Sequence, residues 1–421
     1  MSVEETEVLV VGGGQAGIAM SEHLSAAGVE HLVLERARIA ERWRSERWDS
    51  LVANGPAWHD RFPGMSFEGY GPDAFVPKEV IADSLVAHAG AHGAPIREGV
   101  EVTRLIRNPD GAGFLAETGA GPVMARYVVA ATGPFQRPVI PPIVPPMPGL
   151  TQIHSVAYRN PDALAPGAVL VVGAGSSGVQ IAAELNRAGR EVYLSVGPHE
   201  RPPRRYRGRD FVWWLGVLNL WDAEATEGVE HTTIAVTGAD GGVTVDFRDL
   251  AASGITLTGR AQSFADGRLR FADDLCRNVE AGDAYLLALL DQADAWVERQ
   301  RIDLPEEPGA RSLGPLPRAI TDPPRSLDIS EAGVSTIIWA TGFGLDFGWL
   351  QVDAFDAAGR PAHKRGVSTE PGVYFLGLPW LSRRGSSFIW GVWHDAKYIA
   401  DHIAKLRGYL SYEGSAAPVT E

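Results

Sequence analysis

Two glycine-rich segments carry the residue spacing that points most directly to chemistry. Each follows four apolar residues and reads G-x-G-x-x-G, from Gly12 to Gly17 and from Gly173 to Gly178, and each leads into a helical pattern. Such a segment gives a tight turn, a backbone bare enough to touch a pyrophosphate, and a helix N-terminus directed at its negative charge. One match is weak evidence, because glycine-rich turns are common. Two matches after buried-strand patterns predict two dinucleotides bound together, a flavin and a nicotinamide.

The residue that ends the following strand distinguishes the two sites. In the first unit it is Glu35, at the place where a carboxylate accepts hydrogen bonds from ribose hydroxyl groups. In the second unit Ser195 stands there, and five arginines follow between Arg201 and Arg209. A small hydroxyl group with guanidinium groups nearby suits a 2′-phosphate. The pattern therefore predicts FAD in the first site and NADPH in the second. The alternative interpretations are a solvated strand end for Glu35 and a solvated arginine loop.

These motifs define the first set of predicted cofactor contacts. The predicted FAD contacts are Gly12, Gly14, Gln15, Ala16, Gly17, Glu35 and Arg36. The predicted NADPH contacts are Gly173, Gly175, Ser176, Ser177, Gly178, Ser195, Arg204 and Arg205.

Composition excludes several classes of protein. The chain has 421 residues, 45% of them hydrophobic, which suffices for two ordinary cores, and a net charge of −14 that argues against nucleic-acid binding. No apolar stretch approaches the roughly 18 residues of a membrane span. The first strand pattern begins so near the N-terminus that no cleavable signal is expected. We therefore predict a cytoplasmic protein without a membrane segment.

Cysteine and histidine usage narrows the chemistry further. Cys276 is the only cysteine, which excludes an intramolecular disulfide and a redox-active Cys-x-x-Cys pair. An inert, half-buried thiol is expected there. No cysteine and histidine cluster has zinc-ligand spacing, so the sequence predicts no metal site.

Two Ala-Thr-Gly strands organise the chain. The first ends at Thr132-Gly133 and is followed by a proline-rich tether from Pro134 to Pro148, and the second ends at Thr341-Gly342. We predict that they are paired crossings between two domains. The expected fold is α/β, with two Rossmann-like dinucleotide-binding domains arranged as in glutathione-reductase-like flavoproteins. The FAD domain would comprise residues 1–163 and 333–421, and the NADPH domain, residues 164–332, would be inserted in it. Helical spacing between Tyr285 and Val297 predicts a core or lid helix within that insertion.

Taken together, these features resemble the NADPH-dependent class B flavoprotein monooxygenases, and most closely the small bacterial relatives of flavin-containing monooxygenases and plant YUCCA enzymes. The resemblance covers most of the chain and includes the C-terminal segment from Gly372 to Gly377. It implies cofactor contacts at Trp43, Arg44, Thr132, Gly133, Thr341, Gly342, Gly377 and Ser387. Glu41-Arg42 replaces the glycine that normally precedes the Trp-Arg pair in this family, which leaves the local backbone contact with the flavin open.

The resemblance also implies a catalytic residue. Asn54 matches the family's asparagine beside the reactive edge of the flavin, where an amide donates to a developing peroxide or holds the nicotinamide that does so. An Asn-Gly turn at Asn54-Gly55 explains the same residues through backbone geometry alone, and both interpretations stay open.

The linker between the domains departs from the family pattern. The family's linker places a histidine between two aromatic residues, and here His154 and Tyr158 survive without the first aromatic residue. Tyr158 is not followed by the Trp-Pro of Baeyer–Villiger enzymes, which favours oxygenation of a heteroatom or YUCCA-like chemistry. We expect both residues to couple the domains structurally.

The implied reaction uses O₂ and a small-molecule substrate. NADPH would reduce FAD, oxygen would add to give a C4a-hydroperoxyflavin, and this species would oxygenate nitrogen or sulfur, or decarboxylate a 2-oxo acid oxidatively. The alternatives are an NADPH-dependent flavin reductase or oxidase without oxygen insertion, and a regulatory redox-sensing flavoprotein.

The substrate site and the oligomeric state are less determined. His59, Asp60, Arg383 and Arg384 are candidates to line the substrate site, and a solvated loop explains the two arginines equally well. His394 has the character of an ordinary helix histidine, and a homodimer is the default assembly.

Overall fold

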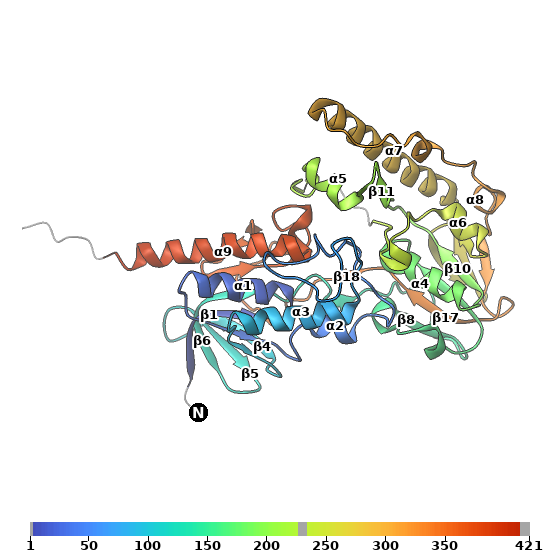
Figure 1. Cartoon of the computed structure of the whole chain (residues 1–421). Coiled ribbons are helices and arrows are strands. Elements are labelled where there is room, and N and C mark those ends of the chain that lie inside the picture. Colours follow the sequence, from blue (N-terminus) through green and yellow to red (C-terminus); the bar gives the residue numbers. More distant parts are fainter. Residues whose placement is uncertain (1–2, 226–233, 413–421) are drawn as a thin grey trace, which may run out of the picture.

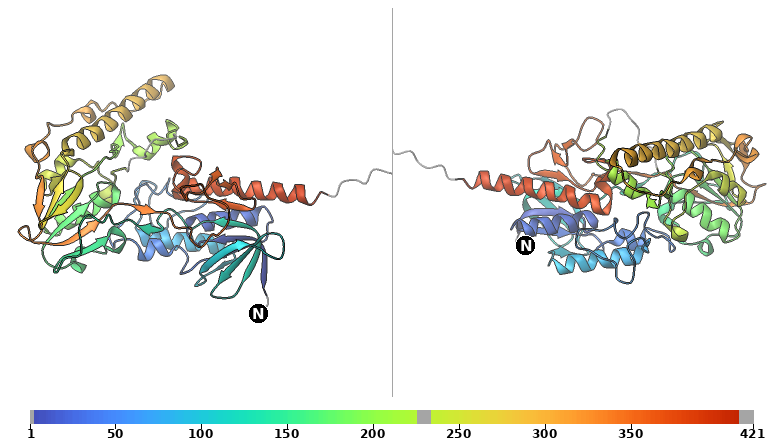
Figure 2. Two further views of the ribbon diagram at one scale, coloured as in Figure 1. Left: turned by 180° about the vertical axis from the view of Figure 1, so that it is seen from behind. Right: turned by 45° about the horizontal axis from the view of Figure 1, so that its top comes forward.

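The computed structural model of the chain describes residues 3–225 and 234–412. Two β-sheets lie at opposite ends of the molecule, and helices pack beside each of them (Figure 1). A view from behind and a view tilted by 45° also show the two sheets apart (Figure 2). The described part of the chain therefore forms two units joined by crossing segments, as the sequence predicts.

The first sheet has nine strands in the order β19-β20-β21-β6-β1-β2-β3, and β5 joins β4 to β6. Pairing is parallel from β21 through β6, β1 and β2 to β3. Residues Val8–Val11 in β1 are all buried, as expected for a parallel strand covered on both faces. The strands are β1 Glu4–Val11, β2 His31–Leu34, β3 Ile96–Arg97, β4 Val102–Arg107, β5 Phe114–Thr118, β6 Val123–Ala130, β19 His363–Lys364, β20 Val367–Ser368 and β21 Val373–Phe375.

The first unit carries three long helices. Helix α1 (Gln15–Ala26) lies between α3 (Lys78–Ala91) and α9 (Ile389–Leu410), which come from distant parts of the sequence (Figure 1). The short helix α2 (Glu41–Ser45) packs beside α3. Because α1 begins directly after the first glycine turn, its N-terminus marks the first candidate cofactor site.

The second sheet is parallel throughout and has the order β13-β10-β9-β17-β8. Its strands are β8 Thr151–His154, β9 Ala168–Val172, β10 Val192–Ser195, β13 Thr256–Thr258 and β17 Val334–Trp339. All five residues of β9 are buried, and α4 (Ser176–Arg187) follows it directly. This is the second strand-turn-helix unit that the sequence predicts.

Smaller elements surround the second sheet. The antiparallel strands are β11 Arg205–Tyr206 with β12 Arg209–Asp210, and β14 Ala261–Ala265 with β15 Arg268–Phe271 and β16 Ser326–Asp328. The remaining helices are α5 Phe211–Val217, α6 Phe247–Ala252, α7 Leu275–Gln300 and α8 Arg318–Thr321. Helix α7 contains the predicted helical stripe, and its buried residues Leu286, Leu289 and Leu290 lie in hydrophobic cores of this unit.

The crossing segments pair with each other, but the sheet boundaries differ from the predicted ones. Strand β7 (Arg137–Pro138) pairs with β18 (Phe343–Gly344), so the two Ala-Thr-Gly strands lead into adjacent crossings. Strands β8 and β17 belong to the second sheet, whereas the sequence-based boundaries at 163 and 333 assigned them to the FAD domain. The same apolar pattern suits either sheet, so only the pairing of β17 with β9, and of β8 with β17, reveals the assignment.

The two units share a packed contact. Trp48 and Leu51 come from the first unit, yet they are buried in a hydrophobic cluster formed with Tyr158 and the second sheet. The loop that follows them contains Asn54. Packing of this loop on the second unit therefore sets where the predicted catalytic residue lies.

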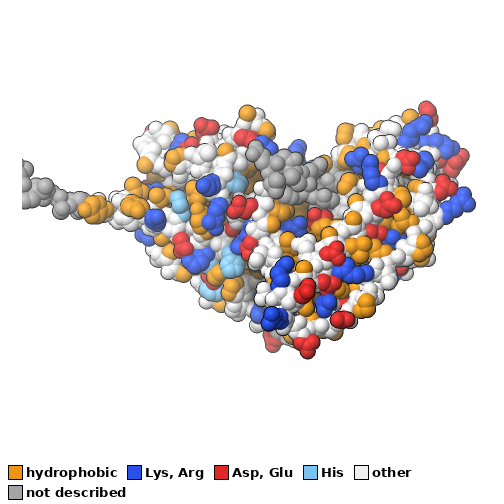
Figure 3. Space-filling model, turned by 90° about the horizontal axis from the view of Figure 1, so that it is seen from above, with side chains coloured by type: hydrophobic (Ala, Val, Ile, Leu, Met, Phe, Trp, Pro, Cys, Tyr) orange, Lys and Arg blue, Asp and Glu red, His pale blue; other side chains and the backbone are white. Residues whose placement is uncertain are grey.

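The described surface is rich in ion pairs. Lys and Arg side chains are interspersed with Asp and Glu side chains on the face drawn in Figure 3. Arg311, for example, pairs with both Asp291 and Asp294 at 2.6 Å. None of the described helices is long and apolar enough to cross a membrane.

Candidate functional site

The first glycine turn is closed on one side and open on the other. A Cβ atom at Gly12 would lie 2.6 Å from the carbonyl oxygen of Ala131, and one at Gly17 would lie 1.8 Å from the carbonyl oxygen of Gly12. Gly12 also has a φ of +113°, which disfavours any side chain. A Cβ at Gly14, in contrast, would meet nothing within 4 Å. The turn thus packs tightly on β6 and leaves open, at Gly14, the space that a pyrophosphate requires.

Helix α1 and Glu35 complete this cradle. No side chain caps the N-terminus of α1, so its first backbone N–H groups remain as donors for an anion. The Glu35 carboxylate accepts hydrogen bonds from the backbone N–H groups of Gly13 (2.6 Å) and Ala37 (2.9 Å). These bonds hold the carboxylate at the end of β2, where a ribose would lie. The chain's own residues therefore fit FAD at this turn.

Side chains around the α1 N-terminus connect three elements. The side-chain amide of Gln15 donates to the carbonyl of Ser387 at 2.8 Å, and the indole of Trp43 donates to the amide oxygen of Gln15 at 3.2 Å. A Cβ at Gly377 would lie 2.9 Å from the Cβ of Ala16. Gln15, Ala16, Trp43, Gly377 and Ser387 thus lie together, and their contact with FAD stays a prediction.

The two predicted arginine contacts in this region have partners within the chain. Arg44 donates to the Asp83 carboxylate on α3 at 2.7 Å, and the Arg36 guanidinium lies 3.9 Å from Glu46. The hydroxyl group of Thr132 and the carbonyl of Gly133 each accept from the side-chain amide of Gln136 at 2.8 Å. Contact of these four residues with FAD stays a prediction.

The second glycine turn repeats the construction of the first. A Cβ at Gly173 would lie 2.4 Å from the carbonyl oxygen of Ala340, and one at Gly178 would lie 1.8 Å from the carbonyl oxygen of Gly173. No side chain caps α4, whose first residues are Ser176 and Ser177 and whose N-cap is Gly175. In each unit, then, the alanine of the Ala-Thr-Gly strand closes the glycine turn. The Ser176 hydroxyl donates to the carbonyl of Ile234 at 2.7 Å.

Ser195 is held by the strand end beside it. Its hydroxyl donates to the carbonyl of Gly259 and accepts from the backbone N–H of Ala261, both at 3.0 Å, and the residue is buried. The residue between these two contacts is Arg260, whose side chain is 60% exposed and lies 3.7 Å from Asp274. Arg260 is an exposed cation at the end of this sheet that sequence reasoning missed, because it is 65 positions after Ser195.

Arg204 takes part in a buried ion pair instead of forming an exposed phosphate ligand. Its guanidinium contacts both carboxylate oxygens of Asp210 at 2.6–2.9 Å, and the side chains of Arg204 and Asp210 are 3% and 9% exposed. Burial lowers the pKa of Arg204, and the charge of Asp210 opposes that effect. Arg205 is exposed and donates to the carbonyl of Gly241 at 3.1 Å. Of the two, only Arg205 offers an accessible guanidinium to a nucleotide.

Asn54 lies at the contact between the two units. Its side-chain oxygen accepts a hydrogen bond of 2.9 Å from Gln180 on α4, and its backbone carbonyl accepts one of 2.7 Å from Arg204. Its Nδ2 group has no hydrogen-bond partner among the described residues. An amide held by its oxygen presents its N–H groups as donors to a ligand. The adjoining Gly55 N–H donates to Asp60 at 3.0 Å, which braces the turn.

His154 and Tyr158 each bond to a distant segment of the chain, and their role as couplers between the domains stays a prediction. One ring nitrogen of His154 donates to the Gly342 carbonyl at 2.9 Å, and the other accepts from the Val156 N–H at 3.2 Å. Burial lowers the pKa of His154, which fits the neutral ring that this bonding requires. The Tyr158 hydroxyl donates to Glu184 on α4 at 2.8 Å, and burial raises its pKa. The Thr341 hydroxyl donates to the Val139 carbonyl in the adjacent crossing.

The substrate candidates surround an aromatic cluster. The ring of His59 stacks on Trp221 at 5.3 Å and lies 5.0 Å from the Trp390 ring. Arg383 pairs with Asp222 at 2.7 Å, and Arg384 lies 3.3 Å from Glu200. Both arginines therefore already have carboxylate partners. His394 faces Trp390 and Trp393, and burial lowers its pKa.

A separate cluster of two histidines and a carboxylate lies between α1 and the C-terminal end of α3, where His92 is the C-cap residue. Glu22 on α1 faces His88 and His92 on α3, with one ligand atom of each residue within 4.8 Å of the others. The prediction of no metal ligands rested on cysteine and histidine spacing. The one-turn separation of the two histidines was a signal for this group, but Glu22 is brought to it only by tertiary packing.

Cys276 is half-buried at the start of α7. Burial and the nearby Glu280 carboxylate raise the pKa of its thiol. Such a thiol has little thiolate character, which agrees with the expected inert residue.

Two family models match the regions that contain the glycine turns. A model described as an FAD binding domain matches residues 5–45, which contain the first glycine turn and Glu35. A second, described as pyridine nucleotide-disulphide oxidoreductase, matches residues 74–215, which contain the second turn. Because the chain has a single cysteine, it cannot form the redox-active disulfide of such a reductase. The second match therefore indicates the dinucleotide-binding fold.

Three known proteins are similar to this chain over part or nearly all of its length. An uncharacterized CzcO-like oxidoreductase of Geobacillus kaustophilus is 34% identical over 94% of this chain and 98% of its own length. The indole-3-pyruvate monooxygenase YUCCA1 of Oryza sativa is 31% identical, over 45% of this chain and 47% of its own. The structure of a flavin-containing monooxygenase from Stenotrophomonas maltophilia covers 96% of this chain and 100% of its own, with a TM-score of 0.66 at 18% identity, and it confirms the predicted fold class.

Two glycine turns, an FAD cradle and a relative matched over nearly its full length lead to one conclusion. The chain is an FAD-binding oxidoreductase of the same family as the CzcO-like oxidoreductases.

Proposed function

We propose that this protein is an NADPH-dependent FAD monooxygenase that transfers one oxygen atom of O₂ to a small organic substrate. The proposed reaction is oxygenation of nitrogen or sulfur, or oxidative decarboxylation of a 2-oxo acid. NADPH would supply a hydride to FAD, and reduced FAD would supply the electrons that activate O₂.

The observation that carries this proposal is the position of Asn54. The residue belongs to the unit with the FAD cradle, but Gln180 and Arg204 of the other unit hold its side-chain oxygen and its carbonyl. This leaves Nδ2 as a fixed donor close to where two dinucleotides would meet. A fixed donor in a water-poor site stabilises a negatively charged oxygen species much better than mobile water does.

We further propose a division of labour among the other residues. Gly12, Gly14, Gly17 and Glu35 hold FAD, and Gly173, Gly178 and the α4 N-terminus hold NADPH. The proposed ligands of the 2′-phosphate are Arg260 and Arg205, which are exposed, in place of Arg204. Ser195 supports this site indirectly, because its hydroxyl holds the two backbone groups that flank Arg260.

The test is a stoichiometry measured on the FAD-loaded protein. NADPH oxidation, O₂ uptake, peroxide release and product would be followed with a panel of amines, sulfides and 2-oxo acids under ¹⁸O₂. The proposal predicts that one substrate class accepts a labelled atom, with close to one product per NADPH. Quantitative peroxide release with every compound would instead assign an oxidase. Tight NADPH binding with hardly any flavin reduction would assign a redox sensor.

A homodimer stays a prediction, which the molecular mass in solution tests.

A further inference from the structure

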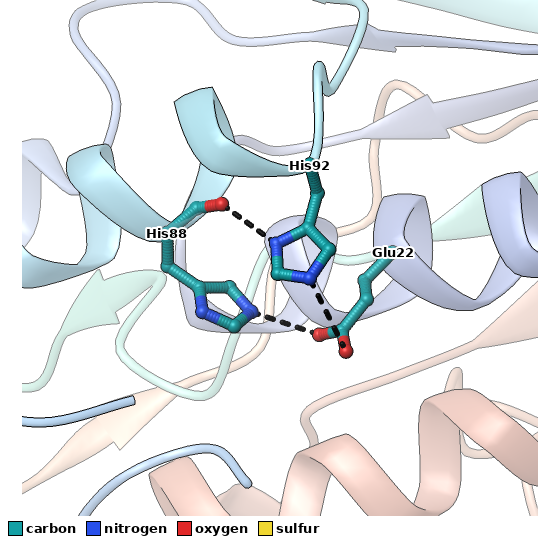
Figure 4. Close-up of side chains that lie close together, drawn as sticks. All are labelled: Glu22, His88 and His92. Carbon is teal, nitrogen blue, oxygen red and sulfur yellow. Dashed lines mark hydrogen bonds and ion pairs between the residues drawn. The ribbon is translucent and has the colours of Figure 1, made fainter. Parts of the chain in front are cut away.

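Glu22, His88 and His92 form a cluster that the proposed oxygenation does not use. His88 and His92 lie one turn apart at the end of α3, and their rings point at the carboxylate of Glu22 on α1 (Figure 4). The His88 Nε2 atom lies 2.9 Å from Glu22 Oε2, and the His92 Nε2 atom lies 3.9 Å from Glu22 Oε1. Two imidazole rings and one carboxylate thus converge on one point.

The hydrogen bonding of His92 indicates which of its ring nitrogens carries the proton. Its Nδ1 atom lies 2.9 Å from the carbonyl oxygen of His88, and since a carbonyl only accepts, Nδ1 carries the proton. In the neutral ring Nε2 is then a bare lone pair, facing a carboxylate oxygen across a gap too long for a hydrogen bond. Two electron-rich atoms aimed at each other repel unless a proton or a metal cation lies between them. A metal ion at this point satisfies both.

The surroundings resemble the second layer of a metal site. Metal-bound histidines commonly donate their other N–H to a backbone carbonyl, as His92 does, and metal-bound carboxylates are themselves hydrogen-bonded. The indole N–H of Trp393 on α9 donates to Glu22 Oε2 at 2.9 Å. This bond orients the Glu22 carboxylate toward the two histidine rings.

We propose that Glu22, His88 and His92 bind a divalent transition-metal ion of the Zn²⁺ type. Two imidazoles and a carboxylate suit Zn²⁺ and disfavour Ca²⁺ and Mg²⁺, which prefer all-oxygen sites. Tetrahedral bonds of about 2.0–2.1 Å place ligand atoms about 3.3 Å apart, between the two separations observed. The His88 ring binds through Nε2 after its proton moves to Nδ1 by exchange with water.

The exposed fractions of the three side chains indicate how the ion enters the site and which ligand completes its coordination. The His88 and Glu22 side chains are 7% and 16% exposed, whereas His92 is 41% exposed. A fourth position on the solvent side, beside His92, is thus open to water. The ion would connect α1 to α3 directly and to α9 through Trp393, and so brace the helix that begins at the FAD cradle. This proposal is independent of the proposed oxygenation.

The test measures metal binding to FAD-loaded, untagged protein after chelator treatment and dialysis. Titration with ZnCl₂ is expected to give one ion per chain and to raise Tm by a few degrees, because the ion binds only the folded state. His92→Ala is expected to abolish the high-affinity step. Trp393→Phe, which keeps an aromatic ring but removes the indole N–H, is expected to weaken binding by about tenfold or more. Co²⁺ is expected to show the intense visible bands of a tetrahedral site.

Two control variants separate this site from other ligands. Cys276→Ser removes the only thiol, and His402→Ala removes another histidine, one that bonds to Tyr374. Both are expected to bind Zn²⁺ as the wild type does. The proposal is overturned if wild-type protein binds no Zn²⁺, if His92→Ala binds it with unchanged affinity, or if Cys276→Ser abolishes the site.

Discussion

The proposed catalytic role of the Asn54 side chain can be tested separately from its structural role in the turn. Its oxygen is held by Gln180, so removal of the amide takes away one fixed donor without exposing a charge. The same residue starts the Asn-Gly turn that Asp60 braces, so the turn is present in the structure, and the catalytic role of Asn54 stays a prediction. Only kinetics tests that role.

We predict that Asn54→Ala lowers product formation by about tenfold to hundredfold, the range for loss of one fixed donor. The rate at which NADPH reduces the flavin is expected to change little, and the lost product should appear as peroxide. Asn108→Ala, which removes a half-buried turn asparagine of the same unit, serves as the control. Equal coupling of NADPH to product in Asn54→Ala and wild type would leave Asn54 with its turn role alone.

A second residue-scale prediction concerns the nicotinamide cofactor. Arg260 lies between the two backbone groups that bind Ser195, and its side chain is largely exposed. Because a charge-assisted hydrogen bond contributes about 1.5–3 kcal/mol, Arg260→Ala is expected to raise KM for NADPH by about tenfold or more. KM for NADH, which lacks the 2′-phosphate, should barely change.

Arg204 provides the matching comparison for that experiment. Replacing it breaks a buried ion pair, which destabilises the fold and affects both cofactors alike. A selective loss of NADPH binding in Arg204→Lys, with unchanged KM in Arg260→Ala, would restore Arg204 as the phosphate ligand.

At the scale of elements, the two glycine turns were predictable from sequence because their constraints are local. Each first glycine has a positive φ, and each third glycine packs on the carbonyl of the first. Partners brought together by tertiary packing were not predictable in this way. Glu22 and His92 are 70 positions apart, and nothing near Arg204 in the sequence shows that its guanidinium is buried on Asp210.

The turns give a matched pair of variants. A Cβ at Gly178 would lie 1.8 Å from a backbone oxygen, so Gly178→Ala should push α4 away from its turn. We expect NADPH to reduce the flavin at least about tenfold more slowly, while FAD content stays normal because the first turn is untouched. Gly17→Ala should instead lower the FAD content of the protein, because it disturbs the first turn and leaves the second turn untouched.

Gly90→Ala is the control for these substitutions. Gly90 lies in α3, and a Cβ atom there would meet nothing within 4 Å, so alanine should slightly stabilise the helix. Normal NADPH kinetics in Gly178→Ala would show that the second turn does not hold the nicotinamide cofactor.

At the scale of the whole molecule, histidine burial couples stability to pH. Among the described residues, burial lowers the pKa of seven histidines: His23, His31, His154, His199, His363, His394 and His402. In the unfolded chain their pKa is about 6.5, so the unfolded state binds more protons below neutral pH. Stability contributed by these neutral rings is present above that pKa and is lost as pH falls through it.

We therefore predict that the free energy of unfolding falls between pH 7.5 and pH 5.5, with each such histidine adding at most about 1.4 kcal/mol per pH unit. Urea denaturation at a series of pH values measures this slope. His31→Asn, which removes one buried titrating ring, should flatten the slope even though it lowers stability at pH 7.5. A free energy of unfolding that is constant or rising on acidification would contradict the prediction.

Our central claim also concerns the whole molecule. It is that the two cofactors and Asn54 act together at the contact between the two units. The measurement that tests it most directly is anaerobic reduction of the FAD-loaded protein with NADPH, followed by rapid mixing with oxygenated buffer and no substrate. We predict a long-lived flavin absorbance that differs from both the oxidised and the reduced spectra, and that decays at least about tenfold faster in Asn54→Ala. Immediate return of the oxidised spectrum in the wild-type protein, with stoichiometric peroxide and NADP⁺ still bound, would contradict this claim.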